Sequence, residues 1–209
     1  MTLRDVILVH GLWVPGAVMR PLAWRLAQAG FRCRMFSYQG AARPLEAHAE
    51  RLAHLARETG PAHFVGHSLG GLVVLEALLR HAQIAAGRVV LLGAPVRGCA
   101  AGRRLARLPA GRWFLGRSEE LWREGREARW TRPEALGVIA GSLPIGLGRL
   151  LGRLHNVNDG VVGLDETGVE GMAERVVLPV GHGAMLVSAR VAAQVAAFLT
   201  DAGFAPHRA

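Results

Sequence analysis

Short apolar runs alternate along this chain with longer segments in which apolar residues recur every three or four positions. Continuous apolar runs are typical of parallel strands buried on both faces, and the three-to-four spacing is typical of amphipathic helices. The pattern predicts strands at residues 6–9, 31–36, 64–65, 88–92, 136–140 and 175–179. It predicts helices at residues 24–29, 45–56, 69–80 and 187–198. This alternation predicts an α/β domain with about six mostly parallel strands flanked by helices.

Residues 97–132 break this alternation. The stretch carries ten arginines and four glutamates, with five large apolar residues between them: Trp113, Phe114, Leu115, Trp122 and Trp130. Long insertions in compact domains are usually functional or disordered. We interpret residues 97–132 as a small cap of short helices inserted into a single domain that spans residues 1–209. The alternative is an ordinary amphipathic insertion whose aromatic residues belong to the core.

Composition narrows the class of protein. At 209 residues, with 51% hydrophobic and 20% charged positions, the chain is long and apolar enough for one globular domain with a sizeable core. We find neither the pattern of a signal peptide nor an apolar run of the ~20 residues that a membrane span requires. The two cysteines, Cys33 and Cys99, are far apart in sequence and are expected to be free thiols. These features together predict a cytoplasmic protein.

The net charge of +9 raises the question of nucleic-acid binding. All 25 cationic residues are arginine and none is lysine, in a chain rich in alanine and glycine, so genome composition is the simpler explanation. The sequence has no zinc-ligand spacing, no aromatic RNA-binding strand and no helix-turn-helix pattern. We therefore expect no nucleic-acid partner, although a basic surface favours contact with anionic lipid or acidic partners.

The most informative motif is Gly66-His67-Ser68-Leu69-Gly70-Gly71, which stands between a predicted strand and a predicted helix. A G-x-S-x-G turn in this context holds its serine in a strained conformation, exposed above the sheet. Glycines two positions to either side remove the Cβ atoms that would meet neighbouring backbone. Ser68 is therefore a candidate nucleophile, although G-x-S-x-G strings also occur by chance in glycine-rich chains.

A serine nucleophile needs an imidazole base, and the imidazole needs a carboxylate that fixes its tautomer. His182 follows the last predicted strand and precedes the closing helix, where a base can face the turn. His155 is a weaker alternative, and His207 lies in the terminal tail. In strand-turn-helix hydrolases the acid lies between the serine and the histidine, which favours Asp159. The runners-up for the acid are Asp165 and Glu166.

Acyl transfer also requires N–H donors for the oxyanion of the transition state. We expect one from Leu69, which follows Ser68, and one from Leu12, in the loop after the first strand. Trp13 is the second choice for that donor, and it is also a candidate wall of the acyl site or an ordinary core tryptophan. His10 is expected to organise its loop rather than to act as a base, and His67 is expected to be structural, because its side chain points away from that of Ser68.

These pieces together resemble the α/β-hydrolase superfamily, and within it the small bacterial lipases and esterases. The matching segments are Val9–Leu12, Gly66–Gly71, Leu92–Pro95, Asn158–Val162 and Gly181-His182, so the resemblance spans nearly the whole chain. It implies a minimal α/β-hydrolase fold, because the two strands that open larger members are missing. It also implies Ser68 as nucleophile, Asp159 as acid, His182 as base, and the Leu12 and Leu69 amides as oxyanion donors.

The resemblance implies hydrolysis of small-molecule acyl esters through an acyl-enzyme, with no cofactor. Secreted lipases of this group often bind calcium beside the catalytic histidine, but no carboxylate follows His182 in Gly183-Ala184-Met185, so we predict no such site. A thioesterase or a lipid-surface hydrolase is an alternative with the same chemistry. A hydrolase fold that only binds a ligand or partner is an alternative of another class.

Overall fold

The computed structural model describes residues 3–12, 14–108, 110–111, 115–118, 129–145 and 156–206. Six strands form one sheet in the order β2-β1-β3-β4-β5-β6, and every neighbouring pair is parallel. The strands are β1 (Asp5–Val9), β2 (Arg32–Phe36), β3 (Ala62–His67), β4 (Ala86–Leu92), β5 (Leu136–Gly141) and β6 (Glu174–Leu178). The predicted α/β class and the number of strands are confirmed.

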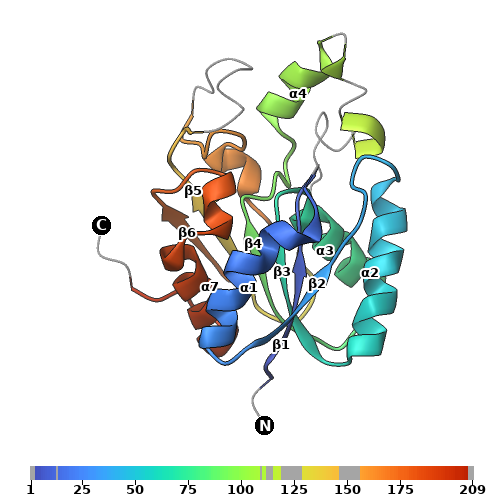
Figure 1. Cartoon of the computed structure of the whole chain (residues 1–209), viewed down its shortest axis with the longest axis vertical. Helices are drawn as coiled ribbons and strands as arrows, with labels where there is room; N and C mark the ends of the chain where they lie inside the picture. Colours follow the sequence, from blue (N-terminus) through green and yellow to red (C-terminus); the bar gives the residue numbers. More distant parts are fainter. Residues whose placement is uncertain are drawn as a thin grey trace.

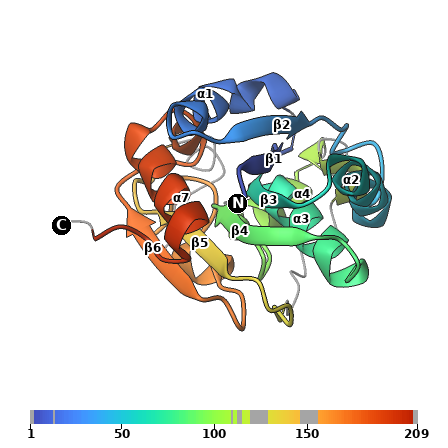
Figure 2. The same ribbon diagram turned by 90° about the horizontal axis from the view of Figure 1, so that it is seen from below.

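Helices cover both faces of this sheet, as Figures 1 and 2 show. They are α1 (Arg20–Gln28), α2 (Leu45–Thr59), α3 (Leu69–Arg80) and α7 (Ala189–Asp201), whereas α4 (Ala100–Ala106) lies on neither face. Val6 and Leu8 of β1 belong to the core cluster that contains α1 and α7, whereas Ile7 and Val9 belong to the cluster that contains α2 and α3. The period-two alternation of a strand thus supplies both cores, which explains why β1 is apolar throughout.

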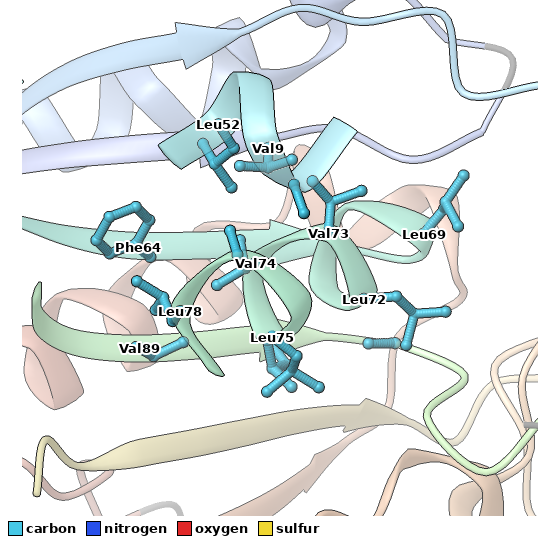
Figure 3. Packing of buried hydrophobic residues seen from close by; sticks show 14 of the residues in the cluster. Val9, Leu52, Phe64, Leu69, Leu72, Val73, Val74, Leu75, Leu78 and Val89 are labelled. Atoms are coloured by element: carbon cyan, nitrogen blue, oxygen red, sulfur yellow. The ribbon is translucent and has the colours of Figure 1, made fainter. Parts of the chain in front are cut away.

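Helix α3 is the most buried of the helices. Ten of its twelve residues are buried, and it packs between the sheet and α2. Figure 3 shows leucines and valines of α3 packed with Phe64, Val89 and Leu52 in one core cluster. A helix this apolar on most sides is fixed in position by packing, so its first residue is fixed relative to the sheet as well.

One predicted boundary was wrong. The closing helix begins at Ala189, because the Ser188 hydroxyl accepts the Val191 N–H and caps it. Val187 therefore precedes the helix and is 54% exposed, so it is not part of the apolar stripe. The predicted segment from Trp24 to Ala29 lies at the end of α1, which begins at Arg20 and leaves Trp24 exposed on its surface.

Helix α4 lies beyond the carboxyl ends of the strands (Figure 1). Its first N–H, that of Ala100, donates to Glu166 Oε1, and the Arg117 N–H donates to the carbonyl of Ala41. Leu115 and Trp130 are buried in the core, while Trp113, Phe114 and Trp122 lie outside the described residues. A cap formed by residues 97–132 stays a prediction. Within the described ranges, none of the helices is long and apolar enough to cross a membrane.

Candidate active site

The strand order alone predicts where in this sheet a ligand would bind. From β1 the chain runs outward to β2 on one side and then returns to β3 on the other. Loops that leave two adjacent parallel strands in opposite directions separate at their carboxyl ends, and open α/β sheets bind ligands there. The loop after β1 contains Leu12 and the turn after β3 contains Ser68. The two predicted oxyanion donors and the predicted nucleophile therefore meet at one point.

Ser68 occupies the strained turn that its motif predicts. Its φ and ψ are 54° and −126°, and its N–H donates to the Leu92 carbonyl at 2.9 Å. A Cβ on Gly66 would lie 2.6 Å from the Gly71 Cα, and one on Gly70 would lie 2.3 Å from the Val9 carbonyl oxygen. Glycine is thus required on both sides of Ser68, because any side chain there would overlap backbone. The close packing of α3 against the sheet keeps Ser68 in this strained conformation.

The side chains of Asp159 and His182 are in contact. His182 Nδ1 lies 2.7 Å from Asp159 Oδ2, and the His182 N–H donates to the Asp159 carbonyl at 2.8 Å. The other carboxylate oxygen accepts the N–H groups of Val161 and Val162 at 2.9 and 2.8 Å. An ionised carboxylate only accepts hydrogen bonds, so the imidazole proton resides on Nδ1 and leaves Nε2 as an acceptor. This is the tautomer that a general base requires.

Gly93 places this pair beside the serine. It follows Leu92, whose carbonyl receives the Ser68 N–H, and it has a φ of 52°. A Cβ on Gly93 would lie 2.9 Å from Asp159 Oδ2 and 3.1 Å from His182 Nδ1. The acid–base pair therefore lies over the end of β4, next to the Ser68 turn. The Ser68 hydroxyl forms no hydrogen bond with the described residues, and such bonds are often long in ligand-free enzymes.

The loop after β1 closes the other side of Ser68. A Cβ on Gly11 would lie 3.0 Å from the Ser68 Cβ, and one on Gly40 would lie about equally close to the side chains of Leu12 and Leu69. Among the described residues, neither the Leu12 N–H nor the Leu69 N–H donates to a protein acceptor. Buried N–H groups are nearly always paired, so two free ones beside a serine are suited to a ligand oxygen. Trp13 lies outside the described residues.

His10 organises this loop, as expected. The Tyr38 N–H donates to His10 Nε2 at 3.2 Å, so the ring proton resides on Nδ1 and is donated to the Gly11 carbonyl at 2.8 Å. Tyr38 also stacks on the ring at 4.5 Å and donates its hydroxyl to the His10 carbonyl. Burial lowers the pKa of His10 and keeps the ring neutral. Both ring nitrogens are thus committed to holding the backbone.

The alternative residues lie elsewhere. Asp165 is exposed and accepts a hydrogen bond from Asn156. Glu166 is buried and accepts the N–H groups of Gly163 and Ala100, so it connects the loop of Asp159 to helix α4. Burial raises the pKa of Glu166, although these N–H donors oppose that shift. His155 and His207 are outside the described residues.

Sequence reasoning missed the roles of Gly93 and Glu166. Gly93 stands directly after an apolar strand, and a glycine at that position is the one signal in the sequence that another segment packs closely against the backbone there. Glu166 carried no such signal, because its partners at Gly163 and Ala100 are backbone groups.

A cavity of about 710 Å³ opens beside the loop after β1. Its wall includes His10, Tyr38, Gly40 and Arg51, but neither Ser68 nor His182. It is therefore a neighbour of the candidate site, and it does not define where an acyl chain would lie.

A parallel α/β sheet with a serine in a strained strand-turn-helix is the arrangement found in α/β-hydrolases. Residues 6–194 match the family model described as "Alpha/beta hydrolase family". The chain belongs to the α/β-hydrolase family.

Three known proteins are similar to this chain, one in sequence and two in structure. The chain is 34% identical over 97 residues to a pimeloyl-[acyl-carrier protein] methyl ester esterase of Vibrio cholerae, and the match covers 44% of this chain and 38% of that protein. It is similar in structure to a Bacillus licheniformis lipase in its propeptide form, with a TM-score of 0.77, 19% identity, and coverage of 99% of this chain and 52% of the lipase. It is also similar to a metagenomic carboxyl esterase, with a TM-score of 0.67, 18% identity, and coverage of 86% and 64%. The two structural likenesses show the fold.

Proposed function

We propose that this protein is a serine hydrolase that cleaves carboxylic esters through an acyl-enzyme intermediate. The observation that carries the proposal is the 2.7 Å contact between Asp159 and His182, located beside the strained turn of Ser68. Membership of the α/β-hydrolase family and the esterase-like neighbours support the same reaction class.

In the proposed reaction, His182 Nε2 takes the proton of the Ser68 hydroxyl as Oγ attacks the ester carbonyl carbon. The carbonyl oxygen becomes an oxyanion and accepts the N–H groups of Leu12 and Leu69. Asp159 stays ionised and stabilises the imidazolium of His182. The tetrahedral intermediate collapses, the C–O bond to the alcohol breaks, and His182 returns its proton to the leaving oxygen.

Deacylation repeats these steps with water. His182 Nε2 takes a proton from a water molecule, whose oxygen attacks the acyl carbon and forms a second tetrahedral intermediate. This intermediate releases Ser68, which regains its proton from His182, and the carboxylic acid leaves. In the reaction as written, this chain supplies the nucleophile of acylation, the acid, the base and the N–H donors, and water is the nucleophile of deacylation.

Helix α4 and residues 116–118 lie over the same end of the sheet, and we propose that residues 97–132 act as a cap for the acyl site. The contacts of Ala100 with Glu166 and of Arg117 with Ala41 support this role, because they join the cap to loops on both sides of Ser68. The cap is the region in which substrate preference is expected to reside.

The test is hydrolysis of p-nitrophenyl esters from acetate to palmitate, with Ser68→Ala as the matched blank. Turnover by the wild type is expected to fall by several orders of magnitude in Ser68→Ala, because the residual rate comes from binding and the N–H donors alone. Equal melting temperatures would show that the variant is folded. A loss of less than about tenfold would overturn the role of Ser68.

The curated relative favours a second candidate substrate, the methyl ester of a longer acyl chain held on an acyl carrier protein. A methyl ester of a dicarboxylic acid, free and attached to such a carrier, belongs in the same assay. Preference for the carrier-bound form over the free methyl ester would support that substrate. A flat response to every ester would contradict the ester proposal and favour a thioester substrate or a binding role.

A further inference from the structure

His67 is a buried imidazole that the proposed reaction does not use. It is the last residue of β3, directly before Ser68, and it is 5% exposed. Its ring lies 4.7 Å from the ring of His182, with an angle of 44° between the planes. Burying a polar ring next to the proposed base costs free energy unless the ring is hydrogen-bonded.

That hydrogen bond defines the state of the ring. His67 Nε2 lies 3.1 Å from the main-chain carbonyl oxygen of His182. A carbonyl oxygen only accepts, so Nε2 carries the proton and donates it. Within the described residues, Nδ1 is buried and has no hydrogen-bond partner. Burial, with the neighbouring His182 as a smaller cause, lowers the pKa of His67 to about 3.

This geometry excludes His67 as a second base. A base needs a lone pair directed at the nucleophile, and the Nε2 position of His67 is occupied by its donated proton. The remaining lone pair, on Nδ1, accepts no hydrogen bond from any described residue, the Ser68 hydroxyl included. The ring therefore acts on the backbone of His182 and not on Ser68.

The backbone around His182 is flexible enough in sequence for this hydrogen bond to restrict it. Gly181 precedes it and Gly183 follows it, and a Cβ on Gly183 would meet nothing within 4 Å. Glycines on both sides give the chain wide conformational freedom, and open space beside one of them provides no steric support. The peptide groups of His182 are held in several ways: its N–H donates to the Asp159 carbonyl, its carbonyl accepts from His67, and the residue caps the 3-10 helix Gly183–Leu186.

We propose that His67 is a positioning residue, whose neutral Nε2–H fixes the main chain of His182 and thereby directs the His182 imidazole at Ser68. The proposal rests on the proposed function for its kinetic consequence, because it assumes that His182 is the base. The hydrogen bond itself and its effect on the Asp159–His182 contact do not depend on that assumption. The two can therefore fail separately.

The kinetic experiment uses three substitutions that differ in where they place a donor. The amide nitrogen of Gln corresponds to Nε2 of histidine, that of Asn corresponds to Nδ1, and Leu has no donor at all. We expect His67→Gln to retain kcat within about threefold, and His67→Asn and His67→Leu to lose roughly 10- to 100-fold in kcat with KM little changed. If His67 had a merely structural role, its substitution would lower the melting temperature. It would not lower kcat selectively over KM, and Gln would not restore the activity.

A second readout needs no substrate. The proton between His182 Nδ1 and Asp159 is expected as a resolved low-field NMR resonance in the wild type and in His67→Gln. It is expected to broaden by exchange with water in His67→Leu, because the loosened loop opens more often. Folded His67→Leu with an unchanged resonance and unchanged kcat would overturn the proposal, even if Ser68→Ala showed that the protein is a hydrolase.

The wild type alone supplies a check if the variants do not fold. Nitrogen-15 shifts of labelled histidines distinguish the tautomers of a neutral ring from the cation. The signal of His67 is assigned through its backbone connectivity, and it is expected to stay neutral and Nε2-protonated from about pH 8 to about pH 5, in keeping with a pKa near 3. If His67 itself does not behave in this way, the donor that the proposal requires does not exist, and the proposal is overturned.

Discussion

The turn of Ser68 and the loops of Asp159 and His182 bring their residues to the same place by different physical means. The turn is held by steric exclusion: Ser68 caps α3 without a side-chain hydrogen bond, and the glycines around it lie against backbone. The loops are held by directional hydrogen bonds, with three donors on the Asp159 carboxylate alone. The site therefore combines a turn that is fixed by steric contacts with loops that are fixed by hydrogen bonds.

The difference extends to the neighbours of each part. Asn158 accepts the Gly160 N–H and donates to the Asn156 carbonyl, which folds the loop of Asp159 onto itself. Glu166 fixes the far end of that loop to α4. The turn of Ser68 has no comparable network, since Leu69 and the rest of α3 are already fixed by the core. Packing fixes the proposed nucleophile, and hydrogen bonds fix the proposed base.

The largest effect is expected from breaking the steric part. In Gly70→Ala the new Cβ would lie 2.3 Å from the Val9 oxygen and 2.4 Å from that of His10, and neither can move unless α3 separates from β1. We expect a loss of more than ~4 kcal/mol in the free energy of unfolding, or no folded protein. Urea unfolding measures this loss. Gly203→Ala is the control, since its nearest neighbour is a carboxylate oxygen 3.7 Å away, and an equal loss in both variants would contradict the account.

The hydrogen-bonded part is expected to fail in activity rather than in folding. In Asp159→Asn the carbonyl oxygen can still accept the N–H groups of Val161 and Val162, but the amide group then donates to His182 Nδ1 and forces the wrong tautomer. We expect kcat to fall about 10³- to 10⁴-fold with a near-normal melting temperature. Asp165→Asn is the matched control and is expected to stay within about twofold, since that side chain is exposed. A larger loss in Asp165→Asn would transfer the role of the acid to it.

A smaller effect is expected where the two parts meet, at His67. The unfolded chain binds a proton on this histidine near pH 6.5, whereas the native ring has a pKa of about 3, so unfolding takes up a proton between these values. Stability is complete above pH 6.5 and is lost as the pH falls toward 3. From pH 8 to pH 5 the wild type should lose roughly 2 kcal/mol more than His67→Gln, measured by urea unfolding at both values. Equal losses in the two proteins would contradict the buried, neutral state of the ring.

The same contrast explains what the sequence could predict. The turn at Ser68 was predictable because its constraint lies within six consecutive residues, and the buried strands because β1, β3 and β4 are apolar on both faces. The pairing of Asp159 with His182 was expected from chain order and from the family resemblance, and the structure places them in contact. The start of α7 was predicted wrongly, because the exposed Val187 was read as apolar periodicity.

The links between distant segments were beyond reach of the sequence. Nothing in one dimension shows that the His67 ring reaches the carbonyl of residue 182, or that Glu166 caps α4. Both contacts join a side chain to a backbone group, and a backbone group has no residue identity to detect. Trp13, the predicted wall of the acyl site, lies outside the described residues and stays a prediction.

The most direct test of the central claim is reaction with a fluorophosphonate, followed by peptide mapping. The reagent forms a covalent bond with a serine only when a base activates its hydroxyl and N–H donors receive the phosphoryl oxygen. The account predicts one adduct per chain, on the peptide that contains Ser68, formed much more slowly in Asp159→Asn. A folded wild-type protein that stays unlabelled, or that is labelled at another serine, would contradict it.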